Sequence, residues 1–325
     1  MTRGVPVTLL RAGAALLVAY GFVVTLWLSS HGSNPQPIAG IREWVNRPLG
    51  LGEDFGPLAV MVLLLCAGYT AGATGFVRTY LPVAVATVLA AGAVLAGLDI
   101  WTVPPEKSVT WANFFGNLTF ASHLVADKTL LVPLAWVVGL QLVAGLVALD
   151  RRGWFAPAAA LVAIAELCVM AANGVALDHL SRPLLFLPLV LFGHVVRRVH
   201  ERALPWWAGL ALGAGCAAAV AAVDRTFPDL QKWWYPVAAT YAVLVFLVAL
   251  LVSGRTAAAV AGLTVTRWLA DRVEWLLVLG GVVGFAVLNA LRREIPVPVG
   301  VVVGLVAVGL AADACHRLTN LRRRA

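Results

Sequence analysis

The sequence contains ten long segments that are apolar and almost free of charged residues. A helix of about 20 apolar residues spans the hydrocarbon core of a bilayer, and in lipid it satisfies all its own backbone polar groups. The pattern therefore predicts an all-α, polytopic integral membrane bundle of about ten transmembrane helices. The predicted spans cover residues 8–29, 56–77, 79–98, 129–149, 153–176, 183–197, 203–223, 233–254, 273–291 and 295–314. The sixth span is the weakest, because its apolar run from Pro183 to Val196 has only 14 residues.

The connections between the spans differ in their content of basic residues. Cytoplasmic loops of membrane proteins carry an excess of Lys and Arg. With the N-terminus placed inside, 15 of the 24 basic residues fall on the inner side and nine on the outer side. Ten of the 16 acidic residues then fall outside. This bias predicts that both ends of the chain lie in the cytoplasm, an N-in/C-in topology.

The composition leaves no room for a separate soluble domain. The chain is 61% hydrophobic and only 12% charged, against about 25% charged in a typical soluble protein. We therefore expect one transmembrane domain covering residues 1–325. The net charge of +8 belongs to the orientation signal, and we expect no nucleic-acid partner, which would need basic residues gathered on one soluble face. Three of the four cysteines lie in predicted spans and Cys315 directly follows the last one, so neither a disulfide framework nor a metal site is expected.

Two connections are more apolar than solvated loops usually are. Residues 99–128 carry several aromatic side chains, among them Trp101, Trp111 and Phe115, and are expected to fold back onto the membrane surface or into the mouth of the bundle. Residues 256–266 are apolar but too short to cross a bilayer. They predict an interfacial helix that leads into the ninth span.

Charged residues inside predicted spans are candidate functional groups, because an ionised side chain is costly in lipid. Glu166 lies mid-way through the fifth span. It is either a ligand for a proton or substrate, or a protonated or hydrogen-bonded carboxyl that faces other helices. Glu274 and Asp313 lie near inner helix ends, next to Arg272 and Arg317, and predict interfacial ion pairs. Arg11, about one turn inside the first span, is expected to extend towards the inner headgroups.

Two outer loops pair a histidine with a carboxylate. His123 precedes Asp127 by four residues, and His179 directly follows Asp178. A histidine oriented by a carboxylate can act as a general base near neutral pH. The simpler interpretation is a solvated loop histidine at each position.

Several motifs occur in the order found in acyltransferase family 3 of the membrane O-acyltransferases, and the chain resembles this family from end to end. These motifs are Leu-Arg-Ala-Gly-Ala-Ala at 10–15, the second-span run at 62–69, Arg-Thr-Tyr-Leu-Pro at 78–82, the stretches 113–119 and 133–142, Leu-Phe-Gly at 191–193, Ala-Asp-Arg-Val-Glu-Trp at 270–275, and the closing helix at 311–320. The resemblance implies a ten-span bundle with both ends inside. It also implies that Arg11 contacts the phosphates of an acyl donor such as acyl-CoA.

The chain departs from the family pattern at the residues that carry its chemistry. The first-helix histidine position is Phe22, and the second histidine would fall near Gly281. The fourth-span glutamate would fall near Gly139, although Gln141 remains, and the final glutamate corresponds to Asn320. Acyl transfer to a hydroxyl needs a base, and the loss of general-base help costs about 10²–10⁴ in rate. Whether the chain is an enzyme is therefore open.

Three functions are compatible with these features. The first is an O-acyltransferase that moves a small acyl group onto a cell-envelope glycan, a lipid or a secreted metabolite, with His123 or His179 as the replacement base. The second is a catalytically inactive relative that binds lipid or glycan, or that scaffolds an envelope protein complex. The third is a transporter, although the spans show no paired Gly/Pro-broken helices in matching halves. None of these functions requires a bound cofactor.

Two observations would separate these hypotheses. If no histidine or carboxylate lies within hydrogen-bond reach of the cavity beside Arg11, the enzyme falls below the binding protein. A water-filled path near Glu166 at mid-membrane would favour the transporter. The 21 arginines against three lysines, with abundant Ala and Val, suggest a GC-rich bacterial genome. We therefore expect a multi-pass protein of a bacterial plasma (inner) membrane, with membrane lipids as its first partners.

Overall fold

The fold is described by a computed structural model for residues 4–30, 36–51, 54–72, 76–98, 100, 109–125, 130–231, 235–251 and 255–321. Every regular element in these ranges is a helix, which confirms the all-α prediction. The α-helices are α1 (Gly4–Ala19), α2 (Trp27–Ser30), α3 (Gln36–Ile41), α4 (Gly56–Thr70), α5 (Phe76–Leu95), α6 (Trp111–Leu118), α7 (Ala135–Val147), α8 (Phe155–Ala172), α9 (Ser181–His200), α10 (Trp206–Thr226), α11 (Pro228–Gln231), α12 (Tyr235–Leu251), α13 (Arg255–Gly262), α14 (Thr264–Leu279), α15 (Phe285–Leu291) and α16 (Val297–Leu321).

Five shorter helical segments complete the order of elements. Three are π-helical and two are 3₁₀ turns. The π-helical segments are η1 (Tyr20–Leu26), η2 (Arg42–Asn46) and η6 (Gly280–Gly284), and the 3₁₀ turns are η4 (Ala121–His123) and η5 (Asp178–Leu180).

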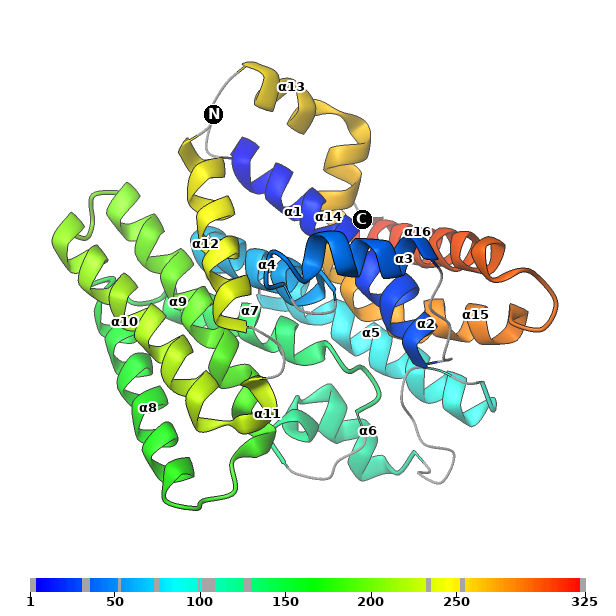
Figure 1. The fold of residues 1–325 in the computed structure, drawn as a ribbon, viewed down its shortest axis with the longest axis horizontal. Helices are drawn as coiled ribbons and strands as arrows, with labels where there is room; N and C mark the ends of the chain where they lie inside the picture. Colours follow the sequence, from blue (N-terminus) through cyan, green and yellow to red (C-terminus); the bar gives the residue numbers. More distant parts are fainter. Residues whose placement is uncertain are drawn as a thin grey trace.

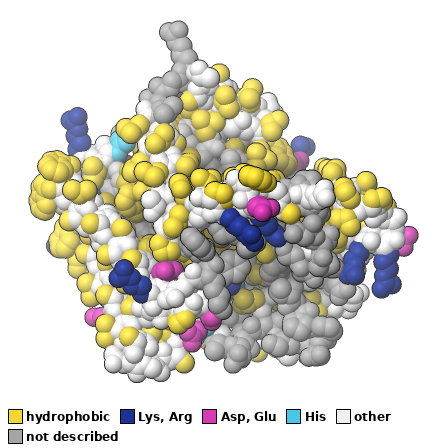
Figure 2. Space-filling model, viewed as in Figure 1, with side chains coloured by type: hydrophobic (Ala, Val, Ile, Leu, Met, Phe, Trp, Pro, Cys, Tyr) yellow, Lys and Arg dark blue, Asp and Glu magenta, His cyan; other side chains and the backbone are white. Residues whose placement is uncertain are grey.

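Seven helices of the described residues are long and apolar enough to cross a membrane, or up to eight if the bent pair α12 and α13 counts as one span. They identify a helical membrane protein. The predicted number of about ten is not reached on length alone, because α4 has 15 residues and α7 has 13, whereas a helix needs about 20 to span the hydrocarbon core. Figure 2 agrees with a lipid environment, since hydrophobic side chains cover much of the visible face and charged ones are few.

Helix α4 forms the centre of the bundle (Figure 1). It packs against α1, α7, α9 and α12, and every residue from Ala59 to Cys66 is buried. A helix that is hydrophobic all round belongs in the interior of a bundle. Helices α8 and α10 lie at the edge beside α9, and α16 lies at the opposite edge beside α14 and α15. These edge helices bury less than a quarter of their apolar stretch, so their remaining apolar faces are available to lipid.

Helices α4 and α9 approach closely through two glycines. A Cβ atom on Gly68 would overlap the carbonyl oxygen of Val190, and one on Gly193 would overlap the carbonyl oxygen of Leu65. Small residues allow membrane helices to pack backbone against backbone, where lipid supplies no hydrophobic force between helices. The two glycines therefore fix the distance between the central helix and α9.

The sixth span is longer than its apolar run of 14 residues. Helix α9 runs from Ser181 to His200, which is 20 residues, and more than half of its apolar stretch is buried. The helix starts before Pro183, because proline is tolerated in the first turn of a helix. It continues past Val196 because Arg197 and Arg198 occupy the last turn, where positive charge complements the helix dipole.

The ninth span also begins earlier than predicted. Helix α13 forms the expected short helix, but α14 starts at Thr264 instead of residue 273. Glu274 therefore lies well inside α14 and not in its first turn.

The described part of the apolar segment 99–128 folds back and packs on the bundle. Helix α6 packs on α5, where the Tyr80 hydroxyl donates a hydrogen bond of 2.8 Å to the Leu118 carbonyl. The Tyr80 ring also contacts Phe120, with 6.0 Å between ring centroids. Trp111 and Phe115 remain exposed on the outer side of α6. Trp101 lies outside the described residues.

Candidate functional site

Arg11 is held by an ion pair inside the bundle. Its Nη2 donates to both carboxylate oxygens of Glu274, at 2.6 and 2.8 Å, and its Nε donates to the Ala270 carbonyl at 3.1 Å. The side chains of Arg11 and Glu274 are 24% and 17% exposed. Charge-assisted hydrogen bonds of this length are among the strong ones in proteins. Arg11 was expected to extend towards the inner headgroups; in the structure its guanidinium bonds to Glu274 and to the Ala270 carbonyl of α14.

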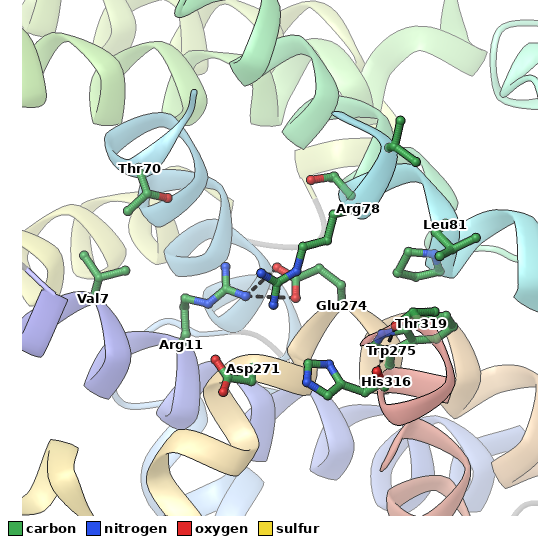
Figure 3. Close-up of a pocket in the computed structure, with 13 residues that line it drawn as sticks. Val7, Arg11, Thr70, Arg78, Leu81, Asp271, Glu274, Trp275, His316 and Thr319 are labelled. Carbon is green, nitrogen blue, oxygen red and sulfur yellow. Dashed lines mark hydrogen bonds and ion pairs between the residues drawn. The ribbon is translucent and has the colours of Figure 1, made fainter. Parts of the chain in front are cut away.

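A cavity of about 560 Å³ opens beside this ion pair, and we call it the Arg11 cavity. Five helices line it: the first half of α1, the end of α4, the start of α5, the middle of α14 and the end of α16. Its lining residues are Val7, Arg11, Thr70, Val77, Arg78, Thr79, Leu81, Pro82, Asp271, Glu274, Trp275, His316 and Thr319. Figure 3 shows Arg11 reaching in from α1 and Arg78 from α5, with the Glu274 carboxylate bonded to Arg11.

The polar groups of the Arg11 cavity are of several kinds. Arg78 is exposed, and among the described residues no carboxylate lies within ion-pair distance of it. Asp271, Glu274 and His316 are the groups that can accept or donate protons there. Within the described residues, no three of His, Cys, Asp and Glu are grouped to hold a metal ion. The arrangement can bind an anion through Arg78 and can exchange protons through the neighbouring acids and His316.

A second, smaller cavity lies against the same ion pair, and we call it the Gln141 cavity. Its volume is about 140 Å³. Arg11, Thr70, Thr79 and Glu274 border both cavities. The remaining lining residues are Ala67, Ala71, Gly72, Phe76, Gln141, Leu142 and Gly145, which carry no charge.

Asp313 forms a separate cluster that joins α14 and α16. Its Oδ1 accepts from Arg272 Nε at 2.8 Å and from Trp268 Nε1 at 3.0 Å, and its Oδ2 pairs with Arg317 at 2.6 Å. The predicted ion pairs are therefore confirmed for Asp313. For Glu274 the predicted partner is wrong, since its carboxylate bonds to Arg11.

A third cavity, of about 300 Å³, lies at the other end of α1, and we call it the Phe22 cavity. Asp54, Trp136, Arg182 and Tyr235 are among its lining residues. The ring of Phe22 packs against the backbone of Gly280, where a Cβ would lie 3.3 Å from Phe22 Cγ. This contact joins the π-helical segments η1 and η6. Such segments occur frequently at functional sites in helices.

His123 is buried, so the expectation of a solvated histidine is wrong for it. Only 8% of its surface is exposed, and its Nε2 has no hydrogen-bond partner in the part of the chain that the structure describes. Burial lowers its pKa from 6.5 to about 4, although a hydrogen bond with the Val132 backbone opposes this shift. The imidazole is therefore neutral at pH 7. Asp127, its predicted partner, lies outside the described residues.

The other predicted candidates are separated from the cavities. Asp178 is exposed and His179 half-buried at the start of α9, and neither lines the Arg11, Gln141 or Phe22 cavity, nor does His123. Glu166 is exposed on α8. It does not face other helices of this chain, so that interpretation of Glu166 is wrong, and it lines none of the three cavities.

The sequence did not predict that Asp271, Glu274 and His316 lie beside Arg11. Asp271, Glu274 and His316 come from α14 and α16, more than 250 residues along the chain. One signal was present for Arg11, which is the one charged residue of α1, since a charge in an apolar helix tends to pair with an opposite charge. Glu274 gave no such signal, because α14 also carries Arg267, Asp271 and Arg272. Comparisons with protein-family models, with curated proteins and with solved structures found no match to this chain.

Proposed function

We propose that this protein is a divergent membrane O-acyltransferase-like protein that binds a phosphate-bearing acyl donor, such as acyl-CoA, in the Arg11 cavity. Its acceptor would be a glycan, a lipid or a secreted metabolite of the cell envelope. The observation that carries the proposal is the pair of guanidinium groups, Arg11 and Arg78, at one cavity. Guanidinium matches the geometry of phosphate oxygens and remains charged at any physiological pH.

The orientation of the helices supports a cytoplasmic donor. We place ten spans in a bacterial inner membrane with both termini in the cytoplasm, counting α4, α7 and α12 with the seven longer helices. The Arg11 cavity is lined by the early parts of α1 and α5, by the middle of α14 and by the ends of α4 and α16. These helices then cross in alternate directions, and the cavity opens on the side where acyl-CoA is made. The Phe22 cavity lies on the opposite side, which suits an envelope acceptor.

The cavity also contains groups that can move a proton. Asp271, Glu274 and His316 line it beside Arg11. Their presence keeps the enzyme hypothesis, which a cavity without a histidine or carboxylate would have lowered below the binding protein. His316 is the best candidate for a base, because a neutral imidazole nitrogen can accept a proton and Glu274 is already bonded to Arg11. His123 and His179 are not supported in this role, since they line none of the three cavities.

A catalytically inactive protein of the same fold, which binds lipid or glycan or holds an envelope partner, is the second candidate. The observation that favours it is the contact between Phe22 and Gly280. Neither residue has a side chain that can accept or donate a proton. The resemblance implies one histidine at Phe22 and a second near Gly281, which follows Gly280. A transporter has less support, because Glu166 lines none of the three cavities.

Two measurements test the proposal. Purified protein in lipid nanodiscs is titrated with CoA and acetyl-CoA, and Arg78→Ala is expected to weaken binding by about tenfold or more, which is the loss of one charge-assisted contact. Arg225→Ala is the control, since Arg225 is exposed near the end of α10 and lines none of the three cavities. No binding of CoA by the wild type, or equal binding by both variants, would contradict the donor site.

The second measurement compares acylation of envelope glycans, lipids and secreted metabolites with and without the protein. His316→Gln is expected to abolish the difference while it leaves CoA binding intact. If deletion changes no acylation but CoA still binds, the inactive binding protein is the correct interpretation.

A further inference from the structure

The Arg11 and Gln141 cavities meet at one boundary. Arg11, Thr70, Thr79 and Glu274 line both of them. The Arg11–Glu274 ion pair therefore lies between two compartments, and a ligand that occupied both would have to pass the atoms of this pair.

The two compartments differ in charge and in size. Beyond the shared residues, the Arg11 cavity contains Arg78, Asp271 and His316, whereas the Gln141 cavity contains only uncharged side chains. The smaller volume of 140 Å³ equals the liquid volume of about five water molecules. It suits a short, uncharged end of a molecule whose charged end lies in the larger compartment.

Arg11 can bind a second anion without first losing Glu274. Its Nη2 donates hydrogen bonds to the Glu274 carboxylate, and its Nε donates one to the Ala270 carbonyl. None of these bonds involves Nη1. A guanidinium has five N–H donors in a fixed fork. A phosphate entering the Arg11 cavity can therefore approach Nη1 and then compete with the carboxylate for the guanidinium.

We infer that the Gln141 cavity is the subsite for the uncharged end of an anionic ligand, and that the Arg11–Glu274 pair is the gate that must separate before this end can enter. The inference rests on the proposed function only for the identity of the probe, a CoA thioester. The gate is formed by this chain's own residues, since Arg11 and Glu274 bond directly to each other.

Gly145 allows the subsite to be filled without damage to the fold. Gly145 lines the Gln141 cavity, and a Cβ atom added to it would meet no heavy atom within 4 Å. Gly145 lies inside α7, where leucine has a higher helix propensity than glycine. Gly145→Leu therefore narrows the subsite. Gly92→Leu is the matched control, because a Cβ there also meets no atom within 4 Å and Gly92 is exposed on α5 away from both cavities.

The experiment measures binding of CoA and of butyryl-CoA to protein in nanodiscs. Gly145→Leu is expected to weaken butyryl-CoA about tenfold relative to CoA, and Gly92→Leu to change neither. Glu274→Gln is expected to tighten both ligands, since it removes the anion that competes for Arg11. Gly145→Ala, a smaller change, gives the same comparison with a smaller effect if the leucine variant does not fold.

The outcomes separate the two proposals. If wild-type protein binds neither CoA nor butyryl-CoA, the proposed function fails and this inference fails with it. If both ligands bind but Gly145→Leu weakens them equally or not at all, the subsite is wrong and the donor site remains. If Glu274→Gln weakens both ligands, the carboxylate is part of the binding site and the gate is wrong.

Discussion

Arg11 and Glu274 are 263 residues apart in the sequence, and one guanidinium nitrogen of Arg11 lies 2.6 and 2.8 Å from the two carboxylate oxygens of Glu274. The pair joins α1 to α14 close to the cavity that we propose for the acyl donor. Its position gives it two roles, since it holds two helices together and occupies the guanidinium that a phosphate would need.

The structural role predicts coupling between the two residues. Arg11→Met and Glu274→Leu should each lower the melting temperature of the purified protein, because each leaves a partly buried charge without its partner. The double variant should recover part of the loss, with a coupling free energy of about 0.5–3 kcal/mol. Thermal unfolding in one detergent measures all four proteins. Strictly additive losses would show that the pair contributes no interaction energy.

The crossing of α4 and α9 predicts a strong effect of two small substitutions. Gly68→Ala and Gly193→Ala should each destabilise the protein by about 1–3 kcal/mol, because the added methyl group meets a backbone carbonyl that cannot move aside. Gly92→Ala is the control, since its Cβ meets nothing within 4 Å. The yield of monodisperse protein and its melting temperature report the result. A stable Gly68→Ala variant would show that the helices are not this close.

The buried imidazole of His123 predicts that stability falls in acid. Its pKa is lowered to about 4 by burial, from an ordinary value of 6.5. Between these values the unfolded chain binds a proton that the folded chain excludes, so stability is complete above about pH 6.5 and declines towards pH 4.

The pH dependence of the melting temperature, compared with that of His123→Leu, isolates this contribution. The melting temperature of His123→Leu should fall less than that of the wild type between pH 6.5 and pH 4. The melting temperature of His179→Leu should fall as much as that of the wild type. Identical profiles for His123→Leu and the wild type would mean that His123 is accessible to protons in the folded state.

The proposed topology predicts the side on which two loops can be labelled. Arg151→Cys lies between α7 and α8, and Asp178→Cys lies between α8 and α9. Both positions are exposed, whereas Cys66, Cys168 and Cys216 are buried and give little background. In intact cells a membrane-impermeant maleimide should label position 178 and not position 151. Labelling of both positions from outside would place α8 on one side of the membrane and remove the ten-span topology.

Local hydrophobic patterns in the sequence predicted where the long helices lie. They did not predict the residues at which two of these helices begin or end. The apolar run from Pro183 to Val196 predicted a short, weak span, yet α9 extends to His200, because basic residues in the last turn favour the helix terminus. The start of α14 was placed at residue 273, while the helix begins at Thr264. In both cases hydrophobicity marks the part of a helix that meets lipid, whereas helix length also depends on capping and on neighbouring helices.

The candidate site shows the same limit more strongly. Arg11 was noted in advance as a charge inside an apolar span, where an ionised side chain is costly, but only the resemblance implied a phosphate contact for it. Its partner was assigned wrongly, since Glu274 was matched to a neighbour in sequence, Arg272. The pairing depends on the depth and rotation of α1 against α14, and neither is encoded in the residues around Glu274.

The sequence by itself therefore determined that this chain is a helical membrane bundle. Its apolar segments are long enough to cross a bilayer, and in lipid only a helix satisfies the backbone polar groups of such a segment. Only the tertiary structure decided that Glu274 bonds to Arg11, that His316 lines their cavity and that Glu166 is exposed on α8. The physical reason is that hydrophobic burial follows from composition along the chain. Hydrogen bonds between side chains require contact to within about 3 Å, which depends on how distant helices pack.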